Sequence, residues 1–204
     1  DQNDNVSSTA SFTGETPNKA LNITSDAQSR VIVSWSDGTD VKILIYSFAF
    51  TAALLIPTLV EIIADVVNVT VIQDPNSNYR IFYEIEATEA ENHYVKKATV
   101  SLSGTVSAIE EVARSVGLAS CAFSINSTIY VNTVHESSLQ STYFVMDESG
   151  NIINKINALN AEGLILIGIL RKVSKISNTQ VLLTNQIRGR AATENGVFFA
   201  LTGI

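Results

Sequence analysis

Residues 31–46, VIVSWSDGTDVKILIY, hold two apolar runs with a short polar stretch between them. Both runs are rich in β-branched and aromatic side chains, which is typical of β-strands. The intervening Ser36, Asp37 and Gly38 are residues that favour turns. This stretch therefore predicts two strands joined by a turn, and the same pattern decides the fold class of the whole chain.

Similar apolar runs of period two recur along the sequence, with turn residues between them. We expect further strands at residues 67–72, 80–88, 94–103, 121–134, 141–146, 164–173, 180–190 and 197–201. The chain is thus predicted to be mainly β, a β-sandwich or jelly-roll-like domain.

Two short helices are expected among these strands. After Pro57, the residues Leu59, Ile62, Ile63 and Val66 lie at helical intervals. At residues 107–117, a serine can cap a helix while the glutamate three positions later reaches back to it.

The run from Ile43 to Val60 carries no charge over eighteen residues, which raises the alternative of a transmembrane helix. Pro57 interrupts the run, and no basic flank marks a cytoplasmic side. We therefore expect a buried strand followed by a short helix, and no membrane span.

Composition limits the classes of protein to which the chain can belong. Apolar residues make up 46% and charged residues 16%, enough for a core and too little charge for disorder. A net charge of -7 repels nucleic acid, so we expect no such partner. Cys121 is the single cysteine, so no intrachain disulfide can form.

Two features favour a secreted, extracellular protein at the cell surface. The sequence opens at Asp1 and its single methionine is Met146, so we expect a removed signal peptide; a trimmed start is the alternative. Four sequons for N-linked glycans stand at Asn5, Asn22, Asn68 and Asn126.

Residues 1–30 are predicted to be an N-terminal arm, and residues 31–204 a single β-sandwich domain. In the arm, one parity holds small or apolar residues, namely Val6, Ser8, Ala10, Phe12 and Gly14, while the other parity is polar. This is the pattern of a strand that lies in a groove, so these residues are the candidate donor strand. A disordered terminus and an ordinary first strand of the same domain remain open as alternatives.

With this arm, residues 5–14 of sequence NVSSTASFTG, the acidic β-rich chain resembles subunits of archaeal extracellular filaments built by donor-strand complementation: threads, bundling pili and cannulae. The resemblance implies a donor strand at the N-terminus, an acceptor groove in a neighbouring subunit, N-glycans, and calcium at subunit contacts as in cannulae. The partner would be the chain itself, in a homopolymer.

Catalytic motifs were sought and not found, so the chain is predicted not to be an enzyme, with no small-molecule substrate and no required cofactor. The only histidines, His93 and His135, lack the spacing of a metal site. Four carboxylates are candidate calcium ligands, namely Glu84, Glu86, Asp37 and Asp40. A solvated face or a turn is the favoured alternative for each.

The sequence therefore predicts a structural subunit of an extracellular surface filament that polymerises by inserting its N-terminal strand into the neighbouring subunit. Two alternatives stay open. One is a viral capsid or coat protein with a jelly-roll fold, and the other is a secreted binding or adhesion module.

Overall fold

The computed structural model describes residues 20–47, 52–74, 77–86, 94–114, 117–125, 128–134, 141–147, 149–157, 169–177, 180–186 and 195–202. These residues form fifteen antiparallel strands in four sheets. The first sheet contains β1 (Ala20–Ser25), β2 (Val31–Ser36), β3 (Asp40–Tyr46) and β4 (Ala53–Ile62). The second contains β5 (Val66–Gln73), β6 (Tyr79–Ile85), β7 (Tyr94–Val100) and β8 (Glu110–Arg114).

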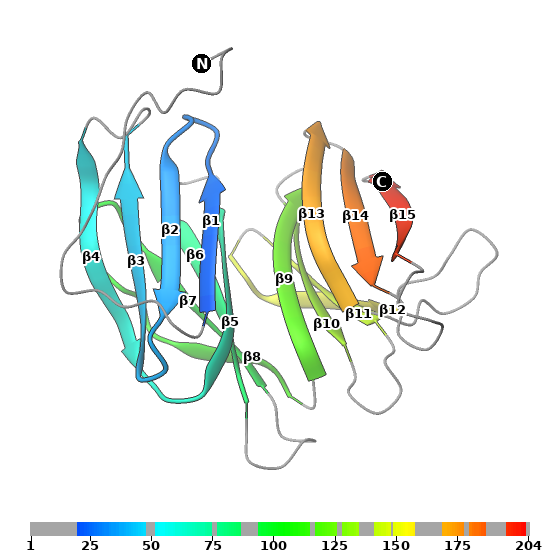
Figure 1. Cartoon of the computed structure of the whole chain (residues 1–204), viewed down its shortest axis with the longest axis horizontal. Coiled ribbons are helices and arrows are strands. Elements are labelled where there is room, and N and C mark those ends of the chain that lie inside the picture. The colour runs from blue at the N-terminus through cyan, green and yellow to red at the C-terminus, as the bar shows by residue number, and fades with distance from the viewer. Residues whose placement is uncertain are drawn as a thin grey trace.

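The remaining strands follow the same plan. The third sheet contains β9 (Gly117–Ile125), β10 (Thr128–Val134), β11 (Ser141–Met146) and β12 (Ile152–Asn157). The last contains β13 (Ile169–Ser177), β14 (Gln180–Gln186) and β15 (Asn195–Thr202). Figure 1 shows the first sheet, in blue to cyan, and the last, in orange to red, at opposite sides of the molecule.

The predicted fold class, mainly β with packed sheets, is confirmed. In every described sheet, strands that follow one another in the sequence also pair with one another, so each sheet is an up-and-down meander. The first strands are in contact from one sheet to the next: β1 with β5, β5 with β9, and β9 with β13. Repetition of small sheets in this way is also the plan of β-propellers, in which the first strands surround a central axis.

Local chemistry explains the hairpin that residues 31–46 form. Asp37 accepts hydrogen bonds from the backbone N and the hydroxyl of Thr39, and Gly38 has a φ of 97°, which L-residues rarely adopt. The turn sets the register of β2 on β3, which places Val33 opposite Leu44 and Ile32 opposite Ile45. The two faces of the hairpin are therefore both apolar.

The main core lies between the first two sheets. Ile32, Ile43 and Ile45 of the first sheet pack with Ile81 and Tyr83 of the second. A second core joins the second and third sheets, with Phe82, Val95, Ile129, Val131 and Met146 among its buried residues. The second sheet is thus buried on both faces.

The predicted helix after Pro57 is wrong, because residues 53–62 form β4. Leu55 and Val60 face the core, which a strand with a local irregularity at Pro57 achieves as well as a helix would. Asp65, with a φ of 62°, lies between β4 and β5 and excludes a continuous helix there. Of the four residues that gave the helical spacing, Val66 is buried and Ile63 packs against the core, whereas Leu59 and Ile62 are exposed, so the spacing does not mark one buried face.

The predicted helix at residues 107–117 is also wrong. The hydroxyl of Ser107 accepts a hydrogen bond from the backbone N of Thr99, 2.8 Å away, instead of capping a helix. Glu110 begins β8 opposite Lys97 of β7, and their charged groups lie 3.1 Å apart. Pairing with β7 thus replaces the local bonds that a helix would have used.

Within the described part of the chain, no helix is long and apolar enough to cross a membrane. The uncharged run that raised this alternative contributes to β3 and β4. Of the predicted arm, residues 20–25 form β1, and residues 1–19 lie outside the described residues.

A polar contact fastens the first sheet to the second inside the main core. Glu61 of β4 accepts hydrogen bonds from the hydroxyl of Tyr83 and from the ammonium of Lys96, each at 2.6 Å. Burial raises the pKa of Tyr83, and the Glu61 acceptor raises it further. The phenol therefore remains a proton donor across the physiological range.

We predict that Glu61→Gln lowers the free energy of unfolding by about 2 kcal/mol, because a charge-assisted contact between sheets is lost. Urea denaturation measured at pH 7 tests this. Glu86→Gln is the matched control, since Glu86 is exposed at the end of β6 and its substitution should change stability by less than about 0.5 kcal/mol. Equal effects of the two substitutions would contradict the role given to Glu61.

Candidate functional site

A cleft of about 470 Å³ lies where the first strands of three sheets come together. Its walls include Thr24 and Ser25 from β1, Val71 and Gln73 from β5, and Phe123 and Ser124 from β9. Clefts of this size are typical of sites for small ligands. Because three sheets supply the walls, no stretch of the sequence contains the site as a motif.

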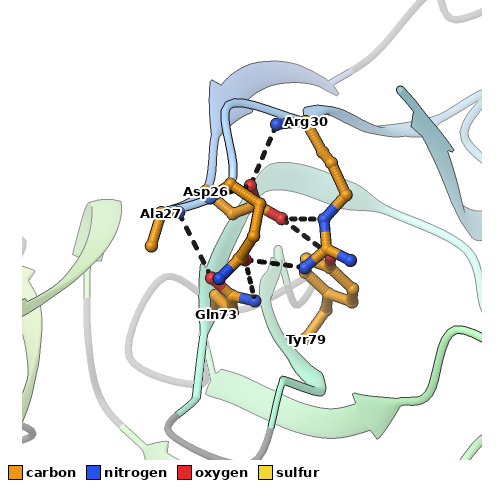
Figure 2. A network of polar contacts seen from close by, with 6 residues as sticks. Asp26, Ala27, Arg30, Gln73 and Tyr79 are labelled. Atoms are coloured by element: carbon orange, nitrogen blue, oxygen red, sulfur yellow. Dashed lines mark hydrogen bonds and ion pairs between the residues drawn. The ribbon is translucent and has the colours of Figure 1, made fainter. Parts of the chain in front are cut away.

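One wall is fixed by the turn between β1 and β2 (Figure 2). Asp26 accepts hydrogen bonds from the backbone N of Gln28 and of Arg30, both at 2.9 Å. It also accepts from Nε of Arg30 at 2.5 Å and from the hydroxyl of Tyr79 at 2.8 Å. This carboxylate therefore holds the turn closed and ties it to β6.

The network continues across to β5. The side-chain oxygen of Gln73 accepts from the backbone N of Ala27 at 3.3 Å, and its amide nitrogen donates to the side-chain oxygen of Gln28 at 2.9 Å. The guanidinium of Arg30 also donates to Gln28 at 2.9 Å and lies over the ring of Tyr79. The side chains along this wall are thus held by one another before any ligand arrives.

The electrostatics of the network follow from these contacts. Burial alone raises the pKa of Asp26, but hydrogen bonds from Arg30 and Tyr79 and the charge of Arg30 outweigh it and hold the pKa below its ordinary value of 3.8. Burial, with Asp26 as acceptor, raises the pKa of Tyr79. Asp26 is therefore an anion at neutral pH whose charge Arg30 balances, and the wall is close to neutral.

No motif in the sequence indicates this site. Asp26, Arg30 and Gln73 belong to a turn and a strand end, and only the contact between the first two sheets brings them together. The one available signal was the polar stretch 24–30, directly before a dense apolar run. Such a polar stretch is equally typical of an ordinary loop.

The four candidate calcium ligands do not gather into one group, although Asp37 and Asp40 lie close enough for their side chains to interact. Asp37 lies in the β2–β3 turn with its carboxylate bound by Thr39, and Asp40 pairs with Lys42 at 3.2 Å. Glu84 is buried within β6, whereas Glu86 is exposed after the strand ends. Among the described residues, no group of three or more His, Cys, Asp or Glu side chains could hold a metal ion.

The other predicted site residues are divided between described and undescribed parts of the chain. The donor-strand residues and the sequons at Asn5 and Asn126 lie outside the described residues. Asn22 and Asn68 lie on β1 and β5, both partly buried, and the side-chain oxygen of Asn22 is enclosed. Glycans are usually carried on exposed loops, so these two positions are poorly placed for attachment.

A second surface feature is the outer face of the first sheet, the face directed away from the second sheet. It carries Leu21 and Ile23 of β1, Val33 and Trp35 of β2, and Leu44 of β3, which lie opposite one another across the strands. Leu21 and Ile23 are exposed at the margin, whereas Val33, Trp35 and Leu44 form a small buried cluster. Lys42, opposite Trp35, and its ion-pair partner Asp40 lie on the same face, so the face is apolar in its middle and charged at one end.

No known family profile and no curated protein matches the chain. Among solved structures, the chain is similar to a crystal structure of exo-β-1,3-galactanase from Phanerochaete chrysosporium with β-1,3-galactotriose, at a TM-score of 0.57 and 14% identity. The match covers 93% of this chain and 49% of that protein, so the chain spans about half of its length. At this identity the likeness shows the fold alone.

That likeness corrects the prediction that the chain is not an enzyme. The prediction rested on missing sequence motifs, but a glycoside hydrolase has a fold similar to that of this chain. In a fold of repeated sheets, polar groups from distant strands meet only in three dimensions, as they do at the cleft described above. Missing motifs therefore do not exclude an enzyme.

We predict that Asp26→Asn destabilises the protein by about 2 kcal/mol at pH 7, since the ionic contact with Arg30 is lost. The pKa of Asp26 is lowered on folding, so its contribution is present above the unfolded value near 3.8 and is lost as the pH falls through the lower folded value. Thermal unfolding of both proteins between pH 7 and pH 2 tests this. A stability difference that stays constant over this range would contradict the assignment.

Proposed function

We propose that the chain is a structural subunit of an extracellular surface filament, joined to its neighbour by the N-terminal arm. The observation that carries the proposal is the apolar outer face of the first sheet. Val33, Trp35 and Leu44 in the middle of this face are buried within the single chain, whereas Leu21 and Ile23 at its margin are exposed, and exposed apolar patches can mark interaction sites. In the proposed assembly, the arm of the neighbouring subunit covers this exposed margin.

The arm and the outer face have matching chemistry. Residues 5–14 carry no charge, and Val6, Ala10 and Phe12 share one parity. Leu21 and Ile23 are exposed on the outer face, and both belong to β1, an edge strand of the first sheet. An extended segment that places Phe12 on this face buries apolar surface on both partners.

The direction of this contact determines the kind of assembly. The arm and the outer face are different surfaces, so a contact between them is heterologous and, unless a rotation closes it, generates a filament. The sequence contains a single cysteine, so assembly would rest on packing and backbone pairing. The net charge of -7 keeps subunits apart until that specific contact forms.

Deletion of residues 1–14 should abolish filaments and yield a soluble protein that binds the corresponding synthetic peptide. Trp35 is the single tryptophan, and it lies on the outer face opposite the exposed Leu21, so its fluorescence can report a peptide bound over that margin. We expect its emission in the truncated protein to change when the peptide is added and to saturate with peptide concentration.

A peptide with Phe12→Ala is the control and should bind at least about tenfold more weakly, because the large apolar side chain is lost. Filaments of the truncated protein in electron micrographs would refute the proposal. Unchanged Trp35 emission would show that the arm covers a different surface.

A second candidate function is the binding of a neutral sugar in the cleft, which corresponds to a secreted binding module. The observation that favours it is the balance of charges: Asp26 is matched by Arg30, and the amide of Gln73 is fixed. Thr24, Ser25 and Ser124 add hydroxyl groups next to the apolar Val71. A neutral ligand with hydroxyl groups suits such walls better than an ion does.

β-1,3-Galactotriose is the probe for this site, because it is the ligand named with the structurally similar galactanase. We expect titration calorimetry to detect binding that Ala27→Trp abolishes, since Ala27 lines the cleft and a larger side chain would fill it. Ser149→Trp, in the turn between β11 and β12, should leave binding unchanged. Equal binding by all three proteins, or none by the unmodified chain, would exclude this sugar at the cleft.

A further inference from the structure

The outer edges of the first three sheets differ in charge. Their last strands, β4, β8 and β12, each pair on one side only among the described strands. The sequence of β8, EEVAR, holds three charged residues in five, and that of β12, IINKIN, holds a lysine. The sequence of β4, ALLIPTLVEI, holds one charged residue in ten. Exposed edges are normally protected by charged side chains, so β4 is the least protected of the three.

The single charge of β4 does not protect its edge. Glu61 is directed inward, where it accepts hydrogen bonds from Tyr83 and Lys96. On the same side of the strand, Leu55 and Val60 are buried in the main core. The inward side thus anchors β4 firmly to the second sheet and leaves no charge on its other side.

The outward side of β4 is a row of exposed apolar residues. We call it the β4 row, and it consists of Leu54, Ile56, Leu59 and Ile62. Ile56 and Ile62 are 70% and 78% exposed, which is more than any other large apolar residue in the described part of the chain. The row has two members on each side of Pro57 and Thr58, so it is roughly symmetric about the middle of the strand.

This symmetry indicates the partner. When two identical strands pair antiparallel about a two-fold axis, the N-terminal half of each lies beside the C-terminal half of the other. Leu54 and Ile56 of one copy then lie near Leu59 and Ile62 of its partner, and no like charges meet. Ten residues extend over about 33 Å, and Pro57 together with the register shifts along β4 would divide such a ladder into short segments.

We infer that β4 is the contact strand of a two-fold dimer, in which it pairs antiparallel with β4 of a second copy and joins two first sheets into one. The contact does not depend on the arm of the proposed function. In a filament built through the arm, it would join subunits side by side.

Sedimentation equilibrium of the full chain tests this inference. We expect a reversible dimer whose dissociation constant rises at least about tenfold in Ile56→Lys, because a charge then stands in the apolar row. The matched control is Ile153→Lys on β12, at a residue that is 62% exposed, and it should change the constant by less than about twofold. Circular dichroism checks that both variants are folded.

A second measurement locates the contact. In a Cys121→Ser background, Ile56→Cys should be crosslinked to its counterpart by a short bismaleimide, whereas Ile153→Cys should not. A monomer at all concentrations, a dimer equally weakened by both lysine variants, or equal crosslinking of both cysteine variants would overturn the inference.

The two proposals fail separately. Deletion of residues 1–14 should abolish filaments and keep the dimer. Ile56→Lys should abolish the dimer and keep the filaments. A dimer that is lost with the arm would show that the arm, rather than β4, makes the contact between copies.

Discussion

Packing of one sheet on the next is the constraint on which the rest of this structure depends. β6 shows it most clearly, since the whole strand is buried and successive residues enter different cores. Tyr79, Ile81 and Tyr83 belong to the core with the first sheet, and Phe82 belongs to the core with the third. An internal sheet therefore needs apolar side chains on both faces. The first sheet has one neighbouring sheet among the described strands, so the packing of sheets on one another does not account for the apolar residues of its outer face.

The same arrangement separates two kinds of surface. The first strands of successive sheets touch one another, and the cleft lies between their ends with its walls fixed by Asp26 and its partners. The last strands lie at the other edge of each sheet, and their sequences differ in charge. A ligand site at the first strands and an assembly contact at β4 would use opposite edges of the same sheet. They could therefore act without obstructing each other.

The sequence was sufficient for the fold class and for most strands, because periodic apolar residues report burial directly. Residues 141–146, for example, were predicted as a strand and form β11 with the same bounds. It failed where burial is not simply periodic. The helical spacing after Pro57 runs across the end of β4 into β5, and Ser107 and Glu110, which have the spacing of a capping box, bond to β7 instead. The site was not predictable at all, since Asp26 and Tyr79 are 53 positions apart and meet only through sheet packing.

Lys96 and Lys97 show how the placement of charge connects these observations. They are adjacent on β7, so their side chains point to opposite faces of the second sheet. Lys96 reaches Glu61 of the first sheet, while Lys97 reaches Glu110 of β8 and the carbonyl oxygen of Gly150 in the third sheet, 2.6 Å away. This basic pair thus helps to hold three sheets in position. Because Glu61 is drawn inward to complete that arrangement, β4 keeps no charge for its outer side. Glu61 therefore both joins the first sheet to the second and leaves the outer side of β4 apolar.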